Sequence, residues 1–337
     1  MLKEAINRVV EGERLNASES AAVMREIISG RATDAQIGAY LIALRMRGET
    51  VDEIVGAAQA MRAEAEKVPV QSDAVDTCGT GGDRKGTFNI STVAALVTAA
   101  AGVPVAKHGN RSVSSSCGSA DLLEALGVRL DLAPEKVGQS VDEIGIGFLF
   151  APLLHRSMKH AIGPRREIGT RTIFNILGPL TNPAGVKRQV MGVYSRERVR
   201  ELAEALAKLG VVRALVVHGD GTDEVTTTGS TFVAEVENGT VREYEVRPEL
   251  FGVRRSTVEE LRGGTPHENA ELALGILRGE KGPRRDVVVL NAGAAIWIGG
   301  RAANWSEGVE RAEQAIDSGA ALRKLEELRD FSRRAAA

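Results

Sequence analysis

Residues 76–92, DTCGTGGDRKGTFNIST, combine glycine, threonine and aspartate at a density that is typical of a ligand-binding loop. Glycine loses more conformational freedom on folding than any other residue, so this density indicates unusual backbone angles or the close approach of another group. Gly79, Gly81 and Gly82 would let the backbone amides reach a bound anion. For a glycine loop alone, a flexible surface turn is an equal alternative, because short motifs also match by chance.

The apolar residues 93–101 after this loop predict a helix, and Ser91 or Thr92 is its expected N-cap. A helix N-terminus has free amides and the positive end of the helix dipole, which favour an anion by about 0.3–1 kcal/mol at an exposed site. Two familiar phosphate motifs do not match: G-x-x-x-x-G-K-[ST] is missing, and Arg84 stands where G-x-G-x-x-G requires glycine. The sequence therefore indicates neither a P-loop NTPase nor a standard dinucleotide enzyme.

A second polar cluster, KHGNRSVSSSCGSADLLEAL at residues 107–126, follows the next predicted strand. Its cationic, amide and hydroxyl donors are Lys107, His108, Asn110, Arg111 and residues 114–116. Ser119 is the expected N-cap of a further helix. A strand, a polar loop and a helix start thus occur twice within about fifty residues. Because ligands of open α/β sheets bind beyond the carboxyl ends of the strands, two anion sites at one sheet edge are predicted.

A third polar loop, HGDGTDEVTTTG at residues 218–229, again follows a predicted strand. Its adjacent carboxylates, Asp223 and Glu224, suit a solvated turn as well as they suit a metal site. Mg²⁺ is typically held by one or two carboxylates together with phosphate oxygens and water. The spacing of histidines and cysteines fits no zinc site.

The chain has 337 residues, of which 43% are hydrophobic and 26% charged, as in ordinary globular proteins. Its net charge of −2 provides no general attraction for nucleic acid. The two cysteines, Cys78 and Cys117, are expected to be reduced thiols. The N-terminus has no apolar core of signal-peptide length, and glycine and proline interrupt the most apolar run, residues 93–106. We therefore expect a cytoplasmic protein that binds neither nucleic acid nor membranes.

The first 66 residues predict a small lobe of four helices. Three pairs have the capping-box spacing, in which an N-cap side chain and the residue three positions later satisfy each other's amides: Asn16 with Glu19, Thr33 with Gln36, and Thr50 with Glu53. Apolar residues between them recur at helical spacing. These helices are therefore expected to pack against one another.

Beyond residue 73, short β-rich runs alternate with helical patterns, which predicts a mainly parallel sheet wrapped by helices. The expected strands are residues 74–77, 103–106, 147–151, 189–194, 214–218 and 286–290, and the clearest helices are residues 196–209 and 266–278. Asn238 and Gly239 separate two alternating runs and predict a hairpin. Residues 156–183 are too long for a simple crossover, so they are expected to return to the helical lobe and allow a hinged cleft.

At these polar loops the sequence closely resembles the anthranilate phosphoribosyltransferases, which join anthranilate to phosphoribosyl pyrophosphate in tryptophan biosynthesis. The matching stretches lie in the family's order along essentially the whole chain. They are GTGGD at 79–83, NIST at 89–92, KHGNRSVSS at 107–115, RTIFNILGPLTNP at 171–183 and the acidic pair at 223–224. The resemblance implies the α/β fold of nucleoside phosphorylase-like transferases. This fold has two lobes. The helical lobe is expected at residues 1–70 with a returning segment near 165–185, and the α/β lobe at residues 71–164 and 186–337.

The resemblance also implies roles for individual residues. The pyrophosphate loop falls on Gly79, Gly82, Asp83 and Thr87, and the phosphoribosyl turn on Asn89, Ile90, Ser91 and Thr92. Further substrate contacts fall on Lys107, Gly109, Ser114, Ser115 and Ser119. Anthranilate contacts fall on Asn110 and Arg165, and His108 and His155 line the path of the aromatic ring. An arginine suits the planar carboxylate of a benzoate through paired hydrogen bonds.

The implied cofactor is Mg²⁺, two ions for each protomer, with Ser91, Asp223 and Glu224 as ligands. Lys107 and Asp83 are the implied catalytic residues. Catalysis is expected to depend on positioning and on stabilising the departing pyrophosphate rather than on a strong general base. The implied assembly is a homodimer formed through the helical lobe. The sequence leaves open whether an anthranilate synthase amidotransferase also binds. The sequence also does not assign a role to Arg84, at a position where many relatives carry a small residue.

Two other functions on this fold stay open at this stage. A pyrimidine nucleoside phosphorylase would use free phosphate and need no carboxylate pair, so Asp223, Glu224, Asn110 and Arg165 argue against it. A nucleic-acid-binding protein that had lost the enzyme's chemistry should show basic excess and damaged substrate motifs. Here the net charge is −2 and the motifs are intact.

Overall fold

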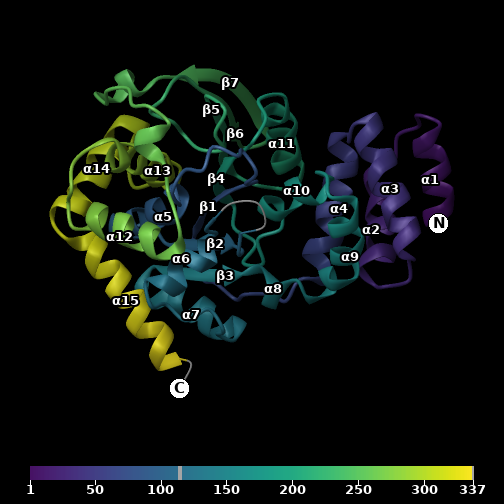
Figure 1. Cartoon of the computed structure of the whole chain (residues 1–337), viewed down its shortest axis with the longest axis horizontal. Helices are drawn as coiled ribbons and strands as arrows, with labels where there is room; N and C mark the ends of the chain where they lie inside the picture. Colours follow the sequence, from purple (N-terminus) through teal and green to yellow (C-terminus); the bar gives the residue numbers. More distant parts are fainter. Residues whose placement is uncertain (113–115, 336–337) are drawn as a thin grey trace.

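The computed structural model describes residues 1–112 and 116–335 and contains a helical lobe beside a larger α/β lobe (Figure 1). The N-terminal helices are α1 (Leu2–Val10), α2 (Ala17–Ile28), α3 (Asp34–Arg47) and α4 (Val51–Glu64). All three predicted capping boxes are present, at the starts of α2, α3 and α4. Each box satisfies two free amides at a helix start, so local sequence sets where these helices begin.

The α/β lobe contains one seven-stranded sheet in the order β3-β2-β1-β4-β5-β6-β7. Its parallel strands are β1 (Val75–Gly79), β2 (Val105–Gly109), β3 (Ile146–Phe150), β4 (Arg188–Gly192) and β5 (Arg213–Gly219). β6 (Thr231–Glu237) and β7 (Thr240–Val246) extend the sheet in antiparallel fashion. The predicted hairpin joins them, with Asn238 and Gly239 both at positive φ. The predicted fold class, a helical lobe with a mainly parallel α/β lobe, is confirmed.

Helices cover both faces of the sheet (Figure 1). One face packs against α5 (Ile90–Ala100), α13 (Pro283–Ile298) and the helices around them. The remaining elements on that side are α6 (Ser119–Ala125), α12 (Pro266–Leu277), α14 (Trp305–Asp317), α15 (Ala320–Ala335), η3 (Pro248–Phe251) and η4 (Glu259–Leu261). The opposite face packs against α11 (Glu197–Lys208) and α7 (Pro134–Ile144). Because α11 also contacts α4, the apolar core continues from the sheet into the helical lobe.

The strand predicted at residues 286–290 is wrong, because this segment lies inside helix α13. The run of Val287, Val288 and Val289 has the β-branched composition of a strand. However, α13 is buried on nearly every side by α5, α14 and the sheet, so it shows no amphipathic period. A short apolar run of this kind cannot be distinguished from a buried strand by sequence alone.

Two predicted N-caps are also wrong. Helix α5 begins at Ile90 with Asn89 as N-cap, so Ser91 and Thr92 lie in its first turn. Helix α6 begins at Ser119, and Gly118 is its N-cap. Both helices begin one or more residues earlier than predicted. The Asn89 side chain binds the Cys117 carbonyl and Asn269 instead of capping α5, and the N-cap of α6 is a glycine without a side chain.

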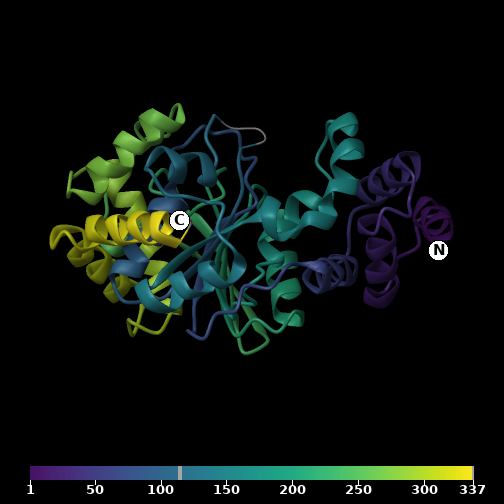
Figure 2. The same ribbon diagram turned by 90° about the horizontal axis from the view of Figure 1, so that it is seen from below.

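Residues 151–180 leave the sheet, reach the helical lobe and come back (Figure 2). The segment contains α8 (Ala151–Leu154), η1 (Arg156–Met158), α9 (Lys159–Ile168), α10 (Phe174–Leu177) and η2 (Gly178–Leu180). α9 packs on α2 and α3, where the His160 ring lies 2.7 Å from a side chain built at Gly30. The exact division of the chain at residues 70, 164 and 186 stays a prediction, as does a hinge. No helix in the described residues is long and apolar enough to cross a membrane.

Two glycines of the helical lobe provide a matched test of its packing. A methyl group on Gly56 of α4 would lie 2.1 Å from the Ala17 carbonyl of α2, whereas one on Gly38 of α3 would meet nothing within 4 Å. Gly56→Ala should therefore lower the free energy of unfolding by about 1–3 kcal/mol, because the backbones must separate. Gly38→Ala should raise it by up to about 1 kcal/mol through helix propensity. Urea unfolding of both variants measures this, and equal effects would contradict the packing.

Candidate active site

The predicted polar loops meet at one edge of the sheet. β1, β2, β4 and β5 are parallel neighbours, so their carboxyl ends lie together. The glycine loop (residues 79–89) follows β1, the second polar cluster follows β2, and the acidic loop (residues 220–226) follows β5. Strand order reverses around β1, with β2 on one side and β4 on the other. Such a switch point is where open α/β sheets bind ligands.

Two glycines let the acidic loop lie directly on the strand ends. Gly79 and Gly192 are register partners at the ends of β1 and β4. A side-chain carbon built on Gly192 would lie 1.5 Å from the carbonyl oxygen of Asp223, and one built on Gly79 would lie 2.4 Å from its Oδ2. These positions therefore require glycine because another part of the protein occupies the space. Gly81 and Gly82 have positive φ, so backbone angles explain those two.

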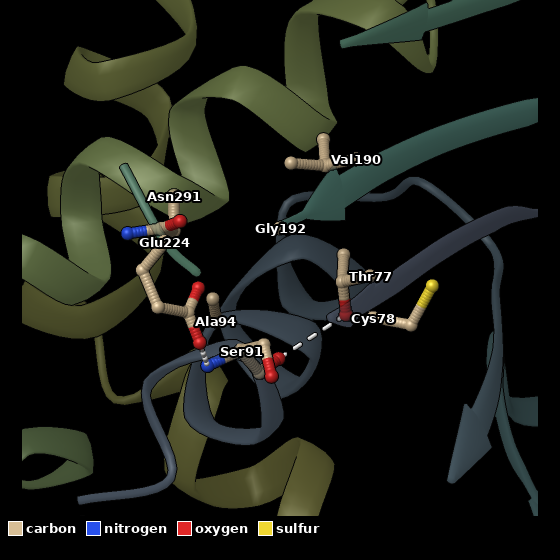
Figure 3. Close-up of a pocket in the computed structure, with 8 residues that line it drawn as sticks. All are labelled: Thr77, Cys78, Ser91, Ala94, Val190, Gly192, Glu224 and Asn291. Carbon is tan, nitrogen blue, oxygen red and sulfur yellow. Dashed lines mark hydrogen bonds between the residues drawn. The ribbon is translucent and has the colours of Figure 1, made fainter. Parts of the chain in front are cut away.

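The acidic loop connects the glycine loop to the first turn of α5. Oδ2 of Asp223 accepts a hydrogen bond from the Gly81 amide at 2.7 Å. Oε1 of Glu224 accepts one from the Ser91 amide at 3.2 Å, and both residues line a small pocket with Thr77 (Figure 3). The three residues predicted as metal ligands, Ser91, Asp223 and Glu224, are therefore brought together.

Three carboxylates beside this pocket, Asp83, Asp223 and Glu224, lie close together, and burial disfavours the charged forms of Asp223 and Glu224. Removal from water raises the pKa of Asp223, and repulsion from Asp83 raises it further. The pKa of Glu224 is raised by burial and then by Asp223. Oδ2 of Asp83 is buried and accepts no hydrogen bond from any described residue. A bound divalent cation would relieve this repulsion, so the donor set fits Mg²⁺.

The protein alone does not complete a metal site. No group of three or more histidine, cysteine, aspartate or glutamate side chains in the described part of the chain is arranged to hold a metal ion. A phosphate-bearing ligand would have to supply the remaining oxygens, as is usual for Mg²⁺.

Lys107, for which a phosphate contact is predicted, has its side chain buried between the end of β1 and the first turn of α5. It is 3% exposed, and its Nζ donates to the Thr77 carbonyl and lies 3.4 Å from Oγ of Ser91. Burial lowers the pKa of Lys107, while the nearby carboxylates, Asp76 first, oppose that shift. The amine therefore sits between β1, the α5 start and the acidic pair, within the same charge cluster.

Other predicted substrate residues are partly engaged in the protein's own structure. Asn89 donates from Nδ2 to the Cys117 carbonyl at 3.0 Å and accepts from Asn269 at 3.0 Å. Thr87 forms an isolated bridge with Arg262. Ile90 and Thr92 are buried in the first turn of α5. The side chains of these residues thus shape the loop, whereas Ser91 and Ala94 of α5 line the pocket.

The second polar cluster is arranged around residues 109–119. Ser119 donates to the Asn110 carbonyl at 3.2 Å, and a side chain on Gly109 would lie 2.3 Å from Oγ of Ser119. Arg111 is not a free cation, because it pairs with Asp121 and Glu124. Ser114 and Ser115 lie outside the described residues.

His108 and His155 form a buried pair, with ring centroids 5.1 Å apart. Nδ1 of His108 lies 3.2 Å from the Gly178 carbonyl, and Nε2 of each ring is buried without a partner among the described residues. Burial lowers the pKa of His108 to about 3, helped by His155, and that of His155 to about 4, helped by Lys67. Both rings are therefore neutral near pH 7.

Arg165 lies on α9 with its guanidinium 5.0 Å from the centre of the Phe174 ring. It is partly buried, burial lowers its pKa, and it forms no ion pair with any residue that the structure describes. A half-buried cation without a carboxylate partner is suited to an anionic ligand.

Residues that the sequence prediction missed hold the returning segment onto the sheet. Arg171 donates to the Gly82 carbonyl and stacks on Tyr194 with its Cζ 4.0 Å from the ring centre. Asn182 donates to Oδ2 of Asp76 at 2.8 Å, and Gln189 donates to the Pro179 carbonyl at 2.7 Å. These contacts could have been suspected from the sequence, because Asp76 in β1 and Gln189 in β4 are polar residues within largely apolar strands and need buried partners.

Comparison with known proteins gives the same assignment over nearly the whole chain. Residues 71–322 match the model of the glycosyl transferase family a/b domain, and residues 3–65 match that of its helical bundle domain. The anthranilate phosphoribosyltransferase of Pelotomaculum thermopropionicum is 58% identical over 98% of this chain and 97% of its own length. The same enzyme from Acetivibrio thermocellus is 54% identical over the same shares. The chain belongs to the anthranilate phosphoribosyltransferase family.

Solved structures of this family agree with the fold. The Thermus thermophilus anthranilate phosphoribosyltransferase superposes with a TM-score of 0.93 at 47% identity, covering 98% of this chain and 99% of that one. The Saccharomyces cerevisiae enzyme, in complex with phosphoribosyl pyrophosphate and Mg, superposes with a TM-score of 0.91 at 28% identity, covering 99% and 98%. The predicted family and the predicted class of glycosyltransferase are confirmed.

The low pKa values of the two histidines predict a loss of stability in mild acid. Both rings stay neutral in the folded protein, whereas the unfolded chain binds protons below a pKa of about 6.5. Stability is therefore intact above that pH and falls as pH drops toward the folded values of about 4 and about 3. At pH 5, each histidine should lower the free energy of unfolding by about 2 kcal/mol relative to its value above pH 7. Urea unfolding measures this effect. Between pH 7.5 and 5, the free energy of unfolding of His108→Asn should fall by about 2 kcal/mol less than that of the unmodified protein. Parallel pH profiles would refute this explanation.

Proposed function

We propose that this protein transfers the phosphoribosyl group of phosphoribosyl pyrophosphate to the amine of anthranilate. The products are N-(5-phosphoribosyl)anthranilate and pyrophosphate, in tryptophan biosynthesis. The observation that carries the proposal is that hydrogen bonds join the acidic pair to the glycine loop and to the α5 start, next to a pocket lined by Ser91 and Glu224. The activity for which the relatives are named supports it.

The proposed pyrophosphate and ribosyl sites lie on the glycine loop and its neighbours. Pyrophosphate contacts Gly79, Gly82, Asp83 and Thr87, and the phosphoribosyl group contacts residues 89–92 with Lys107, Gly109 and Ser119. The positive end of the α5 dipole and the buried Lys107 side chain favour such an anion. Ser114 and Ser115 complete the proposed set.

The proposed anthranilate site lies between the second cluster and the returning segment. Arg165 binds the carboxylate, Asn110 contributes a polar contact, and the neutral rings of His108 and His155 line the way in. The unpaired guanidinium supports the role of Arg165, because a benzoate carboxylate would supply its missing partner.

In the proposed reaction the ribosyl C1–O bond to pyrophosphate breaks and a C1–N bond to the aromatic amine forms. Ser91, Asp223 and Glu224 would hold Mg²⁺, two ions for each protomer, which when bound supplies charge neutralisation for the leaving pyrophosphate. Lys107 adds a fixed positive charge from below, and Asp83 supplies a further carboxylate beside Asp223. The two substrate sites align the reacting atoms, so positioning supplies much of the rate.

A homodimer is proposed through the helical lobe. Large apolar side chains are exposed on the elements of that region, with Val10 69%, Met46 83% and Ile162 48% exposed. A cytoplasmic location is proposed because Cys78 and Cys117 form no disulfide in the described part of the chain.

The direct test is the fall of anthranilate fluorescence when purified protein meets anthranilate, phosphoribosyl pyrophosphate and Mg²⁺. We expect a loss that EDTA abolishes, because the carboxylate pocket needs a cation to accept pyrophosphate. Asp223→Asn should lower turnover strongly with little change in unfolding midpoint. A flat trace from folded protein would overturn the proposal, and turnover of a pyrimidine nucleoside with phosphate would replace it with the phosphorylase alternative.

Arg165→Ala tests the anthranilate site. Loss of a charge-assisted hydrogen bond of about 1.5–3 kcal/mol should raise the KM for anthranilate by about 10- to 100-fold. The KM for phosphoribosyl pyrophosphate should change little, because Arg165 lies on the returning segment rather than on the glycine loop. Arg166→Ala, an exposed neighbour on the same helix, is the matched control. An effect confined to phosphoribosyl pyrophosphate would show that the carboxylate contact is misplaced.

A further inference from the structure

One buried asparagine holds the backbone that carries the acidic pair. Val225 directly follows Glu224, and both of its backbone groups bind the same side chain on α13. Its amide donates to Oδ1 of Asn291 at 3.0 Å, and its carbonyl accepts from Nδ2 of Asn291 at 2.8 Å. Nδ2 also donates to the Val287 carbonyl at 2.8 Å, one helical turn earlier. Asn291 is 3% exposed, so water does not compete for these bonds.

The position of Asn291 is unusual for its helix. The neighbouring side chains of α13, from Val287 to Leu290 and from Ala292 onward, are buried and mostly apolar. A buried amide costs free energy unless it is hydrogen-bonded, and an apolar side chain would pack here without that requirement. Two of the three bonds that satisfy it go to Val225 in the acidic loop. This loop contains no helix or strand and is otherwise held at its ends, by the Gly219–Thr222 bridge and by the bond from the Thr226 amide to Thr231. The amide therefore connects a rigid buried helix to a loop that carries charge.

The restraint passes from Val225 to both carboxylates. The peptide group between Glu224 and Val225 contains the amide that Asn291 binds, so the bond fixes the direction in which Glu224 leaves the backbone. Glu224 in turn accepts from the Ser91 amide, and Asp223 accepts from the Gly81 amide. Asn291 and Glu224 line the same pocket, together with Ser91 (Figure 3).

We propose that Asn291 is a positioning residue of the metal site. It holds the acidic loop so that Asp223 and Glu224 already lie at the metal site and beside the glycine loop before the ligand binds. This inference rests on the proposed function for the identity of the ligand. Groups that orient metal ligands typically contribute 10- to 100-fold to metal affinity. A loop without the clamp would have to become ordered on binding, which lowers affinity.

Two variants of Asn291 and one control test this role. Asn291→Ala removes the amide, and Asn291→Leu removes it while keeping most of the volume. The control is Trp305→Phe, which removes the hydrogen bond from Nε1 of Trp305 to the Leu290 carbonyl, at 3.0 Å. That bond is also buried and lies on the same helix, one residue away, but it does not touch the acidic loop. All three proteins should lose stability, so stability itself does not decide the question.

The first measurement is amide hydrogen exchange of residues 219–228 in the metal-free protein. Both Asn291 variants should exchange the Val225 amide at least tenfold faster, and Trp305→Phe should leave it unchanged. The second is Mn²⁺ binding in the presence of phosphoribosyl pyrophosphate without anthranilate, followed by electron paramagnetic resonance. The Asn291 variants should bind Mn²⁺ at least tenfold more weakly, with the control again unchanged.

Several outcomes would overturn the inference. The first is that Trp305→Phe changes loop exchange and Mn²⁺ binding as much as the Asn291 variants do. The second is that Asn291→Leu binds Mn²⁺ with unchanged affinity. If neither variant folds, an unprotected Val225 amide in the unmodified protein would refute the clamp. Failure of the proposed function is distinguishable, because the unmodified protein would then bind no Mn²⁺ with phosphoribosyl pyrophosphate while the exchange measurement still tests the clamp.

Discussion

The site depends on the close approach of the acidic loop to the ends of two strands. Gly79 and Gly192 end β1 and β4 in register, and Asp223 lies where their side chains would be. Any larger residue at either position would lift the loop away from the switch point. Because of this contact, the carboxylates reach the Gly81 and Ser91 amides, and three segments from distant parts of the chain are joined by hydrogen bonds.

The two faces of the sheet serve different purposes near this edge. The face toward α5 and α13 holds the main apolar core, with the buried Lys107 side chain at the start of α5. The opposite face carries buried polar groups, among them Asp76, His108 and Gln189, which bind the backbone or side chains of the returning segment. The segment that carries Arg165 is therefore attached to the same strands that carry Lys107 and the glycine loop. This attachment places the cation proposed for anthranilate relative to the proposed phosphate site.

The charged groups of the site lie close enough together to shift one another's pKa values. Asp83, Asp223 and Glu224 repel one another, and the buried Lys107 provides only partial compensation. Folding keeps these groups together because the surrounding core and hydrogen bonds hold their backbones in place. Repulsion within such a cluster lowers the free energy of unfolding, as is usual for a preorganised site.

The sequence by itself determined the family, the fold class and the starts of the N-terminal helices. Capping boxes and glycine-containing turns act over a few residues, so local pattern is enough to predict them. It also identified the loops that carry the acidic pair, Lys107 and the glycines, because those motifs are contiguous in the chain. The residue roles carried over from the family resemblance remain proposals.

Tertiary structure alone decided which groups hold these loops in place. The helical state of residues 286–290 follows from burial by three neighbouring elements, which no local period records. Arg171, Asn182 and Asn291 act on residues 89, 106 and 66 positions away, respectively. Such contacts depend on how the sheet brings distant segments together. The local pattern of a single sequence does not show which distant residues will meet. The physical reason is that hydrogen bonds act over about 3 Å in space, whatever the separation along the chain.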